Sequence, residues 1–278
     1  MTSRKDSKSI SLHSHREKMR NPYAYLGPNG DFECLDPKNG ELRASEIKSL
    51  KTDFFKVSNS LKYPMKRKQV AKIAREFMLS RWRSLESRIP DYESRVYESI
   101  NPASGAKAIG YEVIILPMQT GLGADYGIAG FINPEKKQIY IDSQQPSDIL
   151  RFTAAHELGH AIIHPNIGLH RDRSEEFLKS GRPQVEKEAD WFAVEYLMPR
   201  KLVVKEFFNR FGDVEQSKDF FRAGLSIKLK NSTVDQRSMT IALASAGGFL
   251  GKVFMPLHER FGVSVLTMAI RIEELNLV

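Results

Sequence analysis

The stretch SDILRFTAAHELGHAIIHP, residues 147–165, decides both the fold and the chemistry that the chain can carry. Apolar residues recur in it at helical spacing. No proline interrupts it between Pro146, where the first turn of a helix tolerates one, and Pro165, which can end the helix. The spacing predicts a helix with one buried stripe. The residues of that stripe are Ile149, Phe152, Ala155, Leu158, Ala161 and Ile162.

Within this helix lies the pentapeptide HELGH, residues 156–160. Residues four apart on a helix lie on one face, about 5 to 6 Å apart, so the imidazoles of His156 and His160 can reach one metal ion. Glu157 lies beside that ion, where it can act as general base on a bound water whose pKa a zinc ion lowers to about 7. Such a triplet arises by chance on the order of one time in a hundred in a chain of this length, but a chance match lacks this helical context. The motif predicts a metal-dependent hydrolase.

A catalytic zinc site usually has three protein ligands, so one more must be found. His164 continues the four-residue spacing, but one straight helix cannot wrap three consecutive turns around a single ion. A place at the helix end or beside a ligand is therefore favoured for His164. Further along, RPQVEKEADWFAVEYLMP predicts a second helix between Pro183 and Pro199.

Glu186 and Asp190 share one face of this second helix. A carboxylate ligand supplies the charge that holds the ion, and a second carboxylate one turn along can accept a hydrogen bond from a ligating imidazole. We therefore expect Glu186 to be the ligand and Asp190 its orienting partner. Glu188 is the rival ligand, although its side chain projects about 200° around the helix from Glu186. A solvated acidic turn would be favoured for EKEAD in isolation, but HELGH upstream favours the metal site.

The chain resembles the ImmA/IrrE-type metallopeptidases, a bacterial and phage-associated group with a gluzincin-like core. The resemblance rests on RFTAAHELGHAIIH at 151–164, EKEADWFAVEYLMPR at 186–200, GYEVIILP at 110–117 and QIYID at 138–142. It is best from about residue 85 to about residue 200.

The resemblance implies that His156, His160 and Glu186 bind metal and that Glu157 is the catalytic base. Zn²⁺ is the expected ion, although such a ligand set also accepts Mn²⁺. The resemblance also implies a protein substrate, because these enzymes make limited cuts in helix-turn-helix transcriptional repressors and so switch on stress-response or mobile-element genes. Relatives often carry an N-terminal helix-turn-helix domain, and residues 1–60 show no convincing one.

Three short segments predict strands: YEVIILP, YGIAGFI and QIYID, the last two joined by a turn at NPEKK. We expect an α+β fold with a zincin-like core, in which a small, mostly antiparallel sheet packs on the HELGH helix, followed by a helical C-terminal region. By analogy with other zinc peptidases, QIYID is expected to be the edge strand that pairs with an extended substrate. For the oxyanion donor the candidates are His164, His170, Tyr126 and Tyr140, and the sequence does not rank them.

Turn clusters and composition divide the chain into three expected parts. Residues 1–60 form a polar, partly disordered extension, residues 61–200 the peptidase core, and residues 201–278 the helical C-terminal region. Near the end, one helix should stop at Gly262 and another should be capped by Ser264. This pair looks like a helix-turn-helix, but a packed αα-hairpin is more common and an arginine-rich or asparagine-bearing recognition face is lacking.

The formal net charge is +8, and much of the excess lies in one predicted helix within residues 64–88. Its buried stripe would contain Val70, Ile73, Phe77 and Trp82. A basic face can contact phosphates, an acidic partner or only water, and a solvated face is favoured here. The eight basic residues are Lys62, Lys66, Arg67, Lys68, Lys72, Arg75, Arg81 and Arg83, against one acidic residue, Glu76.

Cys34 is the only cysteine, so no internal disulfide can form and a reducing compartment is indicated. The first twenty residues lack the apolar region of a secretory signal, and no segment approaches the roughly 20 apolar residues of a spanning helix. We expect a cytoplasmic protein.

Two other classes of function are a DNA-binding regulator with a structural metal and a protein-interaction module that binds its partner without cutting it. Glu157 argues against the first, because a structural metal site has no use for a base.

Overall fold

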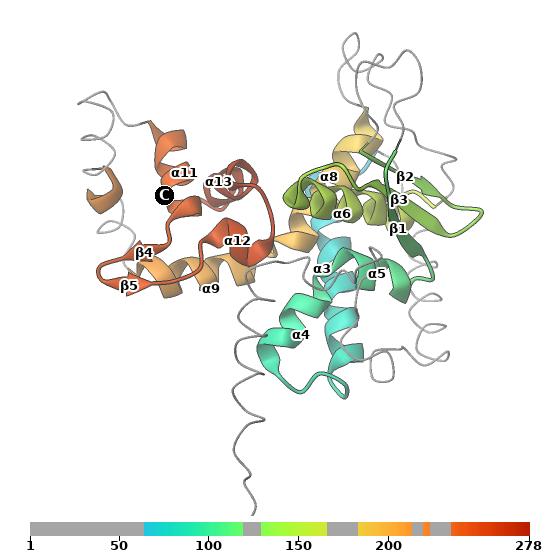
Figure 1. The fold of residues 1–278 in the computed structure, drawn as a ribbon, viewed down its shortest axis with the longest axis horizontal. Helices are drawn as coiled ribbons and strands as arrows, with labels where there is room; N and C mark the ends of the chain where they lie inside the picture. The colour runs from blue at the N-terminus through green and yellow to red at the C-terminus, as the bar shows by residue number, and fades with distance from the viewer. Residues whose placement is uncertain (1–63, 119–128, 166–182, 213–218, 223–234) are drawn as a thin grey trace, which may run out of the picture. The chain divides into compact units, whose positions relative to one another are not determined.

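The computed structural model describes residues 64–118, 129–165, 183–212, 219–222 and 235–278, which all belong to one compact unit, Leu42–Val278. The helices and the small sheets of this unit are shown in Figure 1. Their arrangement is α+β, which confirms the predicted fold class. The division into three parts at residues 60 and 200 stays a prediction.

The first described helix is α3 (Arg67–Leu85), within the range predicted for it. Val70, Ile73 and Phe77 are buried, as expected, whereas Trp82 is only half-buried. The basic face is smaller than predicted, because Arg81 is 1% exposed and donates to the Ser104 hydroxyl and the Glu98 carbonyl oxygen. Lys62 lies outside the described residues. The basic residues exposed near or on α3 are Lys66, Lys68, Lys72, Arg75 and Arg83.

Two shorter helices follow, α4 (Tyr92–Ser99) and α5 (Pro102–Ala108). The start of α5 is set by Asn101, whose side chain accepts hydrogen bonds from the backbone N–H groups of Ala103 and Ser104, and by Pro102 at the first helical position. α5 packs against α6 (Ser147–Ile163), the helix that carries HELGH, and against the first strand of the sheet.

The three-stranded sheet consists of β1 (Glu112–Leu116), β2 (Gly130–Asn133) and β3 (Gln138–Asp142), in the order β1-β3-β2. β2 and β3 form the predicted antiparallel hairpin, whereas β1 pairs with β3 in parallel. The sheet is therefore mixed, with one pairing of each kind. The expectation that QIYID is an edge strand is wrong, because β3 is hydrogen-bonded on both sides. The edges among the described strands are β1 and β2.

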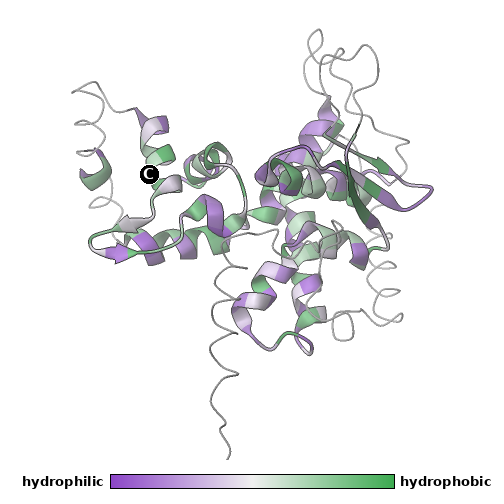
Figure 2. Cartoon of the chain, in the orientation of Figure 1, coloured by the Kyte–Doolittle hydropathy of each residue, from purple (hydrophilic) through white to green (hydrophobic). Residues whose placement is uncertain are grey.

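α6 spans the predicted helix and contacts α8 (Gln184–Leu197), β2 and β3. From Ala154 to His164 every residue is buried, so this half of the helix has no solvent face. The prediction that Ile149 is buried is wrong, since its side chain is 41% exposed. Phe152, also assigned to the buried stripe, is only half-buried. Apart from the buried Leu150, the first two turns of α6 are therefore exposed or half-buried. Figure 2 shows hydrophobic residues along α6 and β1, and hydrophilic residues at the start of α8.

The C-terminal region contains α9 (Arg200–Phe211), α11 (Gln236–Ser245), a two-stranded hairpin of β4 (Gly248–Phe249) and β5 (Lys252–Val253), α12 (Leu257–Phe261) and α13 (Val265–Glu274). α12 ends at Gly262, which has a left-handed conformation with φ 61°, and the Ser264 side chain caps α13, as predicted. α13 packs on α11, and its exposed side chains include Leu266 and Ile270. An apolar outer face favours the packed hairpin over a DNA-reading helix.

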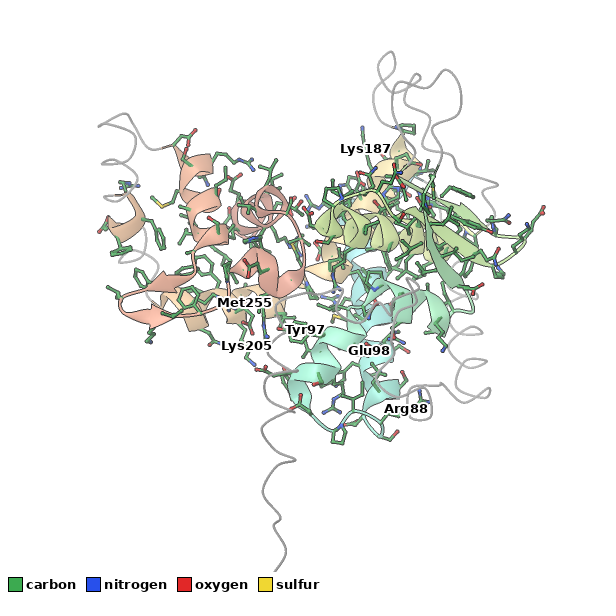
Figure 3. The ribbon with its side chains drawn as sticks, viewed as in Figure 1. Arg88, Tyr97, Glu98, Lys187, Lys205 and Met255 are labelled. Carbon is green, nitrogen blue, oxygen red and sulfur yellow. The ribbon has the colours of Figure 1, made fainter. Side chains whose placement is uncertain are left out.

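α4, α9 and α12 meet around Tyr97, Lys205 and Met255, which Figure 3 labels. The Arg260 guanidinium lies 4.3 Å from the centre of the Tyr97 ring, and the Arg210 Nε donates to the Met255 carbonyl oxygen at 3.0 Å. Burial raises the pKa of Tyr97 well above its usual range, against the opposing charge of Arg260, so its hydroxyl stays neutral at neutral pH. None of the helices in the described ranges combines the length and the apolar character needed to cross a membrane.

Candidate metal centre

His156 and His160 lie one turn apart on the buried half of α6. Their side chains are 8% and 2% exposed, and their Nε2 atoms lie 3.1 Å apart. The helical period sets this distance, because it stacks residues four apart on one face. Two imidazole nitrogens therefore converge on one point in the interior.

Glu186 comes to this point from α8. Its Oε2 lies 3.0 Å from the His156 Nε2, and its Oε1 lies 3.4 Å from the His160 Nε2. Ligand atoms of His156, His160 and Glu186 all lie within 4.8 Å of one another. Two imidazole nitrogens and one carboxylate oxygen are a donor set that suits zinc and leaves a fourth position for water or substrate. The residues that the sequence predicted as ligands thus fit a divalent metal ion.

The electrostatics of the cluster favour a positive charge at its centre. Burial alone would lower the pKa of His156, but hydrogen bonds to Asp190 and Glu186 outweigh it and raise that pKa. Burial would raise the pKa of Glu186, but its contacts with His156 and His160 hold it well below its usual range. Burial lowers the pKa of His160. The two buried imidazoles thus lie between carboxylates. A divalent cation can occupy such a site in place of the proton that the imidazoles and carboxylates would otherwise share.

Asp190 lies where an orienting partner of His156 is expected, with its Oδ1 2.9 Å from the His156 Nδ1. Glu157 is 5% exposed and directly follows His156, and its negative charge contributes to the raised pKa of that histidine. The structure therefore brings together all five residues that the sequence singled out. Their roles as ligands, base and orienting group stay predictions.

Glu188, the rival ligand, points to a different part of the interior. Its Oε2 lies 3.1 Å from the Nε2 of His164, which is the C-terminal cap residue of α6. The Nδ1 of His164 lies 3.1 Å from the Nδ1 of His160. His164 thus lies beside a predicted ligand, as favoured above, but its contact with Glu188 was not foreseen. The signal in the sequence was the rotation of Glu188 by about 200° from Glu186, which takes it to another face of α8.

Gly159, the fourth residue of HELGH, lies where α6 and α8 are tightly packed. A Cβ atom at this position would lie 3.2 Å from the Phe192 Cβ and 3.3 Å from the Ala189 carbonyl oxygen. Any larger residue would push α8 away from α6. This close approach lets Glu186 and Asp190 reach His156, so the glycine of the motif serves the geometry of the site.

Tyr140, another candidate oxyanion donor, has its contacts within the sheet. Tyr140 lies on β3 between the buried Ile139 and Ile141, its hydroxyl donates to the Gln138 Oε1 at 2.6 Å, and its ring stacks on Phe131. His170 and Tyr126 lie outside the described residues. Lys187, labelled in Figure 3, is exposed at the start of α8 between the buried Glu186 and Glu188.

An α+β fold in which a small sheet packs on a helix with two histidines, completed by a glutamate from a second helix, has the architecture of a metallopeptidase. Residues 106–233 match the model of the Peptidase_M78 family, described as the IrrE N-terminal-like domain. The chain therefore contains a domain that matches this family at residues 106–233, which confirms the resemblance to ImmA/IrrE-type metallopeptidases. The matched range includes α6, α8 and all three strands of the larger sheet. A comparison with curated proteins gave no match.

Proposed function

We propose that the protein is a zinc-dependent endopeptidase in which His156, His160 and Glu186 hold the metal and Glu157 is the catalytic base. The observation that carries the proposal is the convergence of these three ligand atoms from two helices in the buried interior. Mn²⁺ would fit the same donors, and its use depends on availability.

A divalent ion held by His156, His160 and Glu186 would polarise the scissile carbonyl group and lower the pKa of the attacking water. Glu157 takes the proton of that water and passes it to the leaving amine. Asp190 accepts a hydrogen bond from the Nδ1–H of His156 and so would direct the Nε2 lone pair of that histidine toward a bound metal ion. Burial of the cluster excludes bulk water and strengthens these interactions.

The substrate that we propose is a helix-turn-helix transcriptional repressor, whose limited cleavage would switch on stress-response or mobile-element genes in the cytoplasm. This part of the proposal rests on the family. A DNA-binding role has less support, because Arg81 is buried and the outer face of α13 is apolar.

An extended substrate would pair with β2 in this proposal, in place of the predicted β3. β2 is an edge among the described strands and contacts α6. The two elements come close at Gly130, where a Cβ atom would lie 2.6 Å from the Thr153 Cγ2. Thr153 precedes His156 by one helical turn, so a substrate strand along β2 would run near the proposed metal site.

The test is to incubate the zinc-loaded protein with a helix-turn-helix repressor encoded beside it and to seek a new N-terminus by mass spectrometry. Glu157→Gln should abolish cleavage and leave the zinc content unchanged, because the amide cannot accept the proton. Lys187→Gln is the matched control, since it changes an exposed residue beside Glu186 and should cleave normally. Cleavage by Glu157→Gln at the parent rate would show that the mechanism is wrong.

A further inference from the structure

His160 has a second set of partners on the side away from Glu186. Its Nδ1 contacts the His164 Nδ1 at 3.1 Å, and the His164 Nε2 contacts the Glu188 Oε2 at 3.1 Å. The side chains of His164 and Glu188 are both 0% exposed. This chain of contacts leads from the proposed metal site across the α6–α8 contact.

Glu188, at the far end of this series of contacts, accepts hydrogen bonds from two further donors. The Glu188 Oε1 accepts the backbone N–H of Met65 at 2.8 Å and the side-chain amide of Gln184 at 3.1 Å. Met65 lies just before α3 and is itself buried. A carboxylate that receives two N–H groups on one oxygen and faces an imidazole with the other is an acceptor at every contact.

The acceptor role of Glu188 sets the direction of the hydrogen bonds from Glu188 through His164 to His160. Because Glu188 only accepts, the His164 Nε2 must donate, and the proton of a neutral His164 therefore lies on Nε2. The His164 Nδ1 is then an acceptor, so the His160 Nδ1 must be the donor. A neutral His160 with its proton on Nδ1 carries its ring lone pair on Nε2, the atom that faces His156 and Glu186.

We propose that Glu188 and His164 are positioning residues that fix the tautomer and the ring orientation of His160, so that its Nε2 can bind metal. The inference rests on the proposed metal site. It gives each histidine ligand an orienting carboxylate: Asp190 acts on His156 directly, and Glu188 acts on His160 through His164. In this proposal neither Glu188 nor His164 is a metal ligand or a substrate contact.

The test measures the Zn²⁺ affinity of the full chain by competition with a chelator. His164→Leu removes the acceptor of His160 and should weaken zinc binding by about 10- to 100-fold, the scale for loss of a ligand-orienting contact. His164→Gln keeps an acceptor and a donor at the two ends of its amide, and should bind within a few-fold of the parent. Glu188→Gln can turn an amide N–H toward His164, reverse the hydrogen bonds and weaken binding as His164→Leu does. Lys187→Gln should leave the affinity unchanged.

A second readout needs no substitution and no metal. Nitrogen NMR of the histidine rings should show the proton on Nε2 of His164 and on Nδ1 of His160, and the reverse assignment would overturn the proposal even if a variant failed to fold. Equal zinc affinity of parent, folded His164→Leu and folded Glu188→Gln would also overturn it. If the parent, and not only the variants, failed to bind zinc, the proposed function would fail, and the NMR assignment would still decide the hydrogen-bond directions.

Discussion

Replacing Arg271 with methionine should lower the free energy of unfolding by about 3 kcal/mol, because it breaks a buried ion pair and leaves its partner behind. Arg271 lies on α13 and is 2% exposed. Its Nη1 and Nη2 donate to the two carboxylate oxygens of Glu195 at 2.9 and 2.7 Å, and its Nε and Nη2 donate to the Met198 carbonyl oxygen at 3.1 and 2.9 Å. These two acceptors lie at the C-terminal end of α8. One side chain therefore fastens α13 to the helix that carries Glu186.

The size of the loss in unfolding free energy depends on the environment of Glu195, the carboxylate that Arg271→Met leaves without its partner. Loss of one partner of a fully buried pair costs about 3 to 5 kcal/mol. The Glu195 side chain keeps 17% exposure, so water can reach it in part, and the lower end of that range applies. Methionine has a similar length and fills much of the space, which limits any cavity cost. The loss would be a large fraction of the roughly 5 to 15 kcal/mol that holds a domain folded.

Urea unfolding of four proteins would check this value: the parent, Arg271→Met, Glu195→Leu and the double variant. The double variant should be less destabilised than the sum of the single variants, because it leaves no buried charge alone. Lys72→Met is the control, since its ion pair with Glu76 joins side chains that are 67% and 49% exposed and should contribute no more than about 1 kcal/mol. A cost below about 1 kcal/mol for Arg271→Met, or strict additivity in the double variant, would refute the reasoning.

Two further predictions concern the geometry around the site. Gly159→Ala should lower the free energy of unfolding by up to about 2 kcal/mol, because overpacking costs about 1 to 3 kcal/mol and the higher helix propensity of alanine offsets about 1 kcal/mol of that. It should also weaken zinc binding about tenfold, because α8 moves away from α6. Unchanged affinity in a chelator competition would contradict this. Asp142→Ala should cost about 1 to 2 kcal/mol, because Asp142 accepts the backbone N–H groups of Met118 at 3.2 Å and Gln144 at 3.1 Å. Burial alone would raise the pKa of Asp142, but these bonds and one from Gln145 lower it, so its contribution is present above about pH 4 and lost in acid. The difference between parent and variant in urea midpoint should therefore shrink from pH 7 to pH 3, and a constant difference would count against the assignment.

Local signals in the sequence predict most of the elements around the site. Prolines and periodicity indicate α6 and α8, and the NPEKK turn indicates the β2–β3 hairpin. Each of these signals acts within a few residues of the chain. The sequence therefore predicts where an element lies more reliably than what it packs against.

The wrong predictions concern long-range contacts. QIYID reads equally well as an edge or a central strand, and only the parallel pairing of β1 makes it central. Ile149 fits the helical stripe, but periodicity does not show where the helix leaves the core. Arg81 adds to the charge of a basic segment, yet it is buried against Glu98 and Ser104, which lie in other elements.

The contact between Glu188 and His164 could not be predicted for a related reason. The spacing of EKEAD assigns Glu186 and Asp190 to one face of a helix and Glu188 to another, but it does not indicate what that other face contacts. In the structure α8 is buried on that side too, because Met65 and the end of α6 lie against it. A helix with two buried faces can present acidic residues on both.

The candidate site is therefore a property of the contact between α6 and α8, and no single motif contains it. The direct partner of His156 and the indirect partner of His160 both cross this contact, and Gly159 sets how close the two helices come. A change that separates the helices by a few tenths of an ångström would disturb the ligand Glu186 and both orienting carboxylates together. Metal affinity should therefore respond to substitutions at this contact more sharply than stability does, because packing elsewhere in the core keeps the helices folded while the ligands lose their alignment.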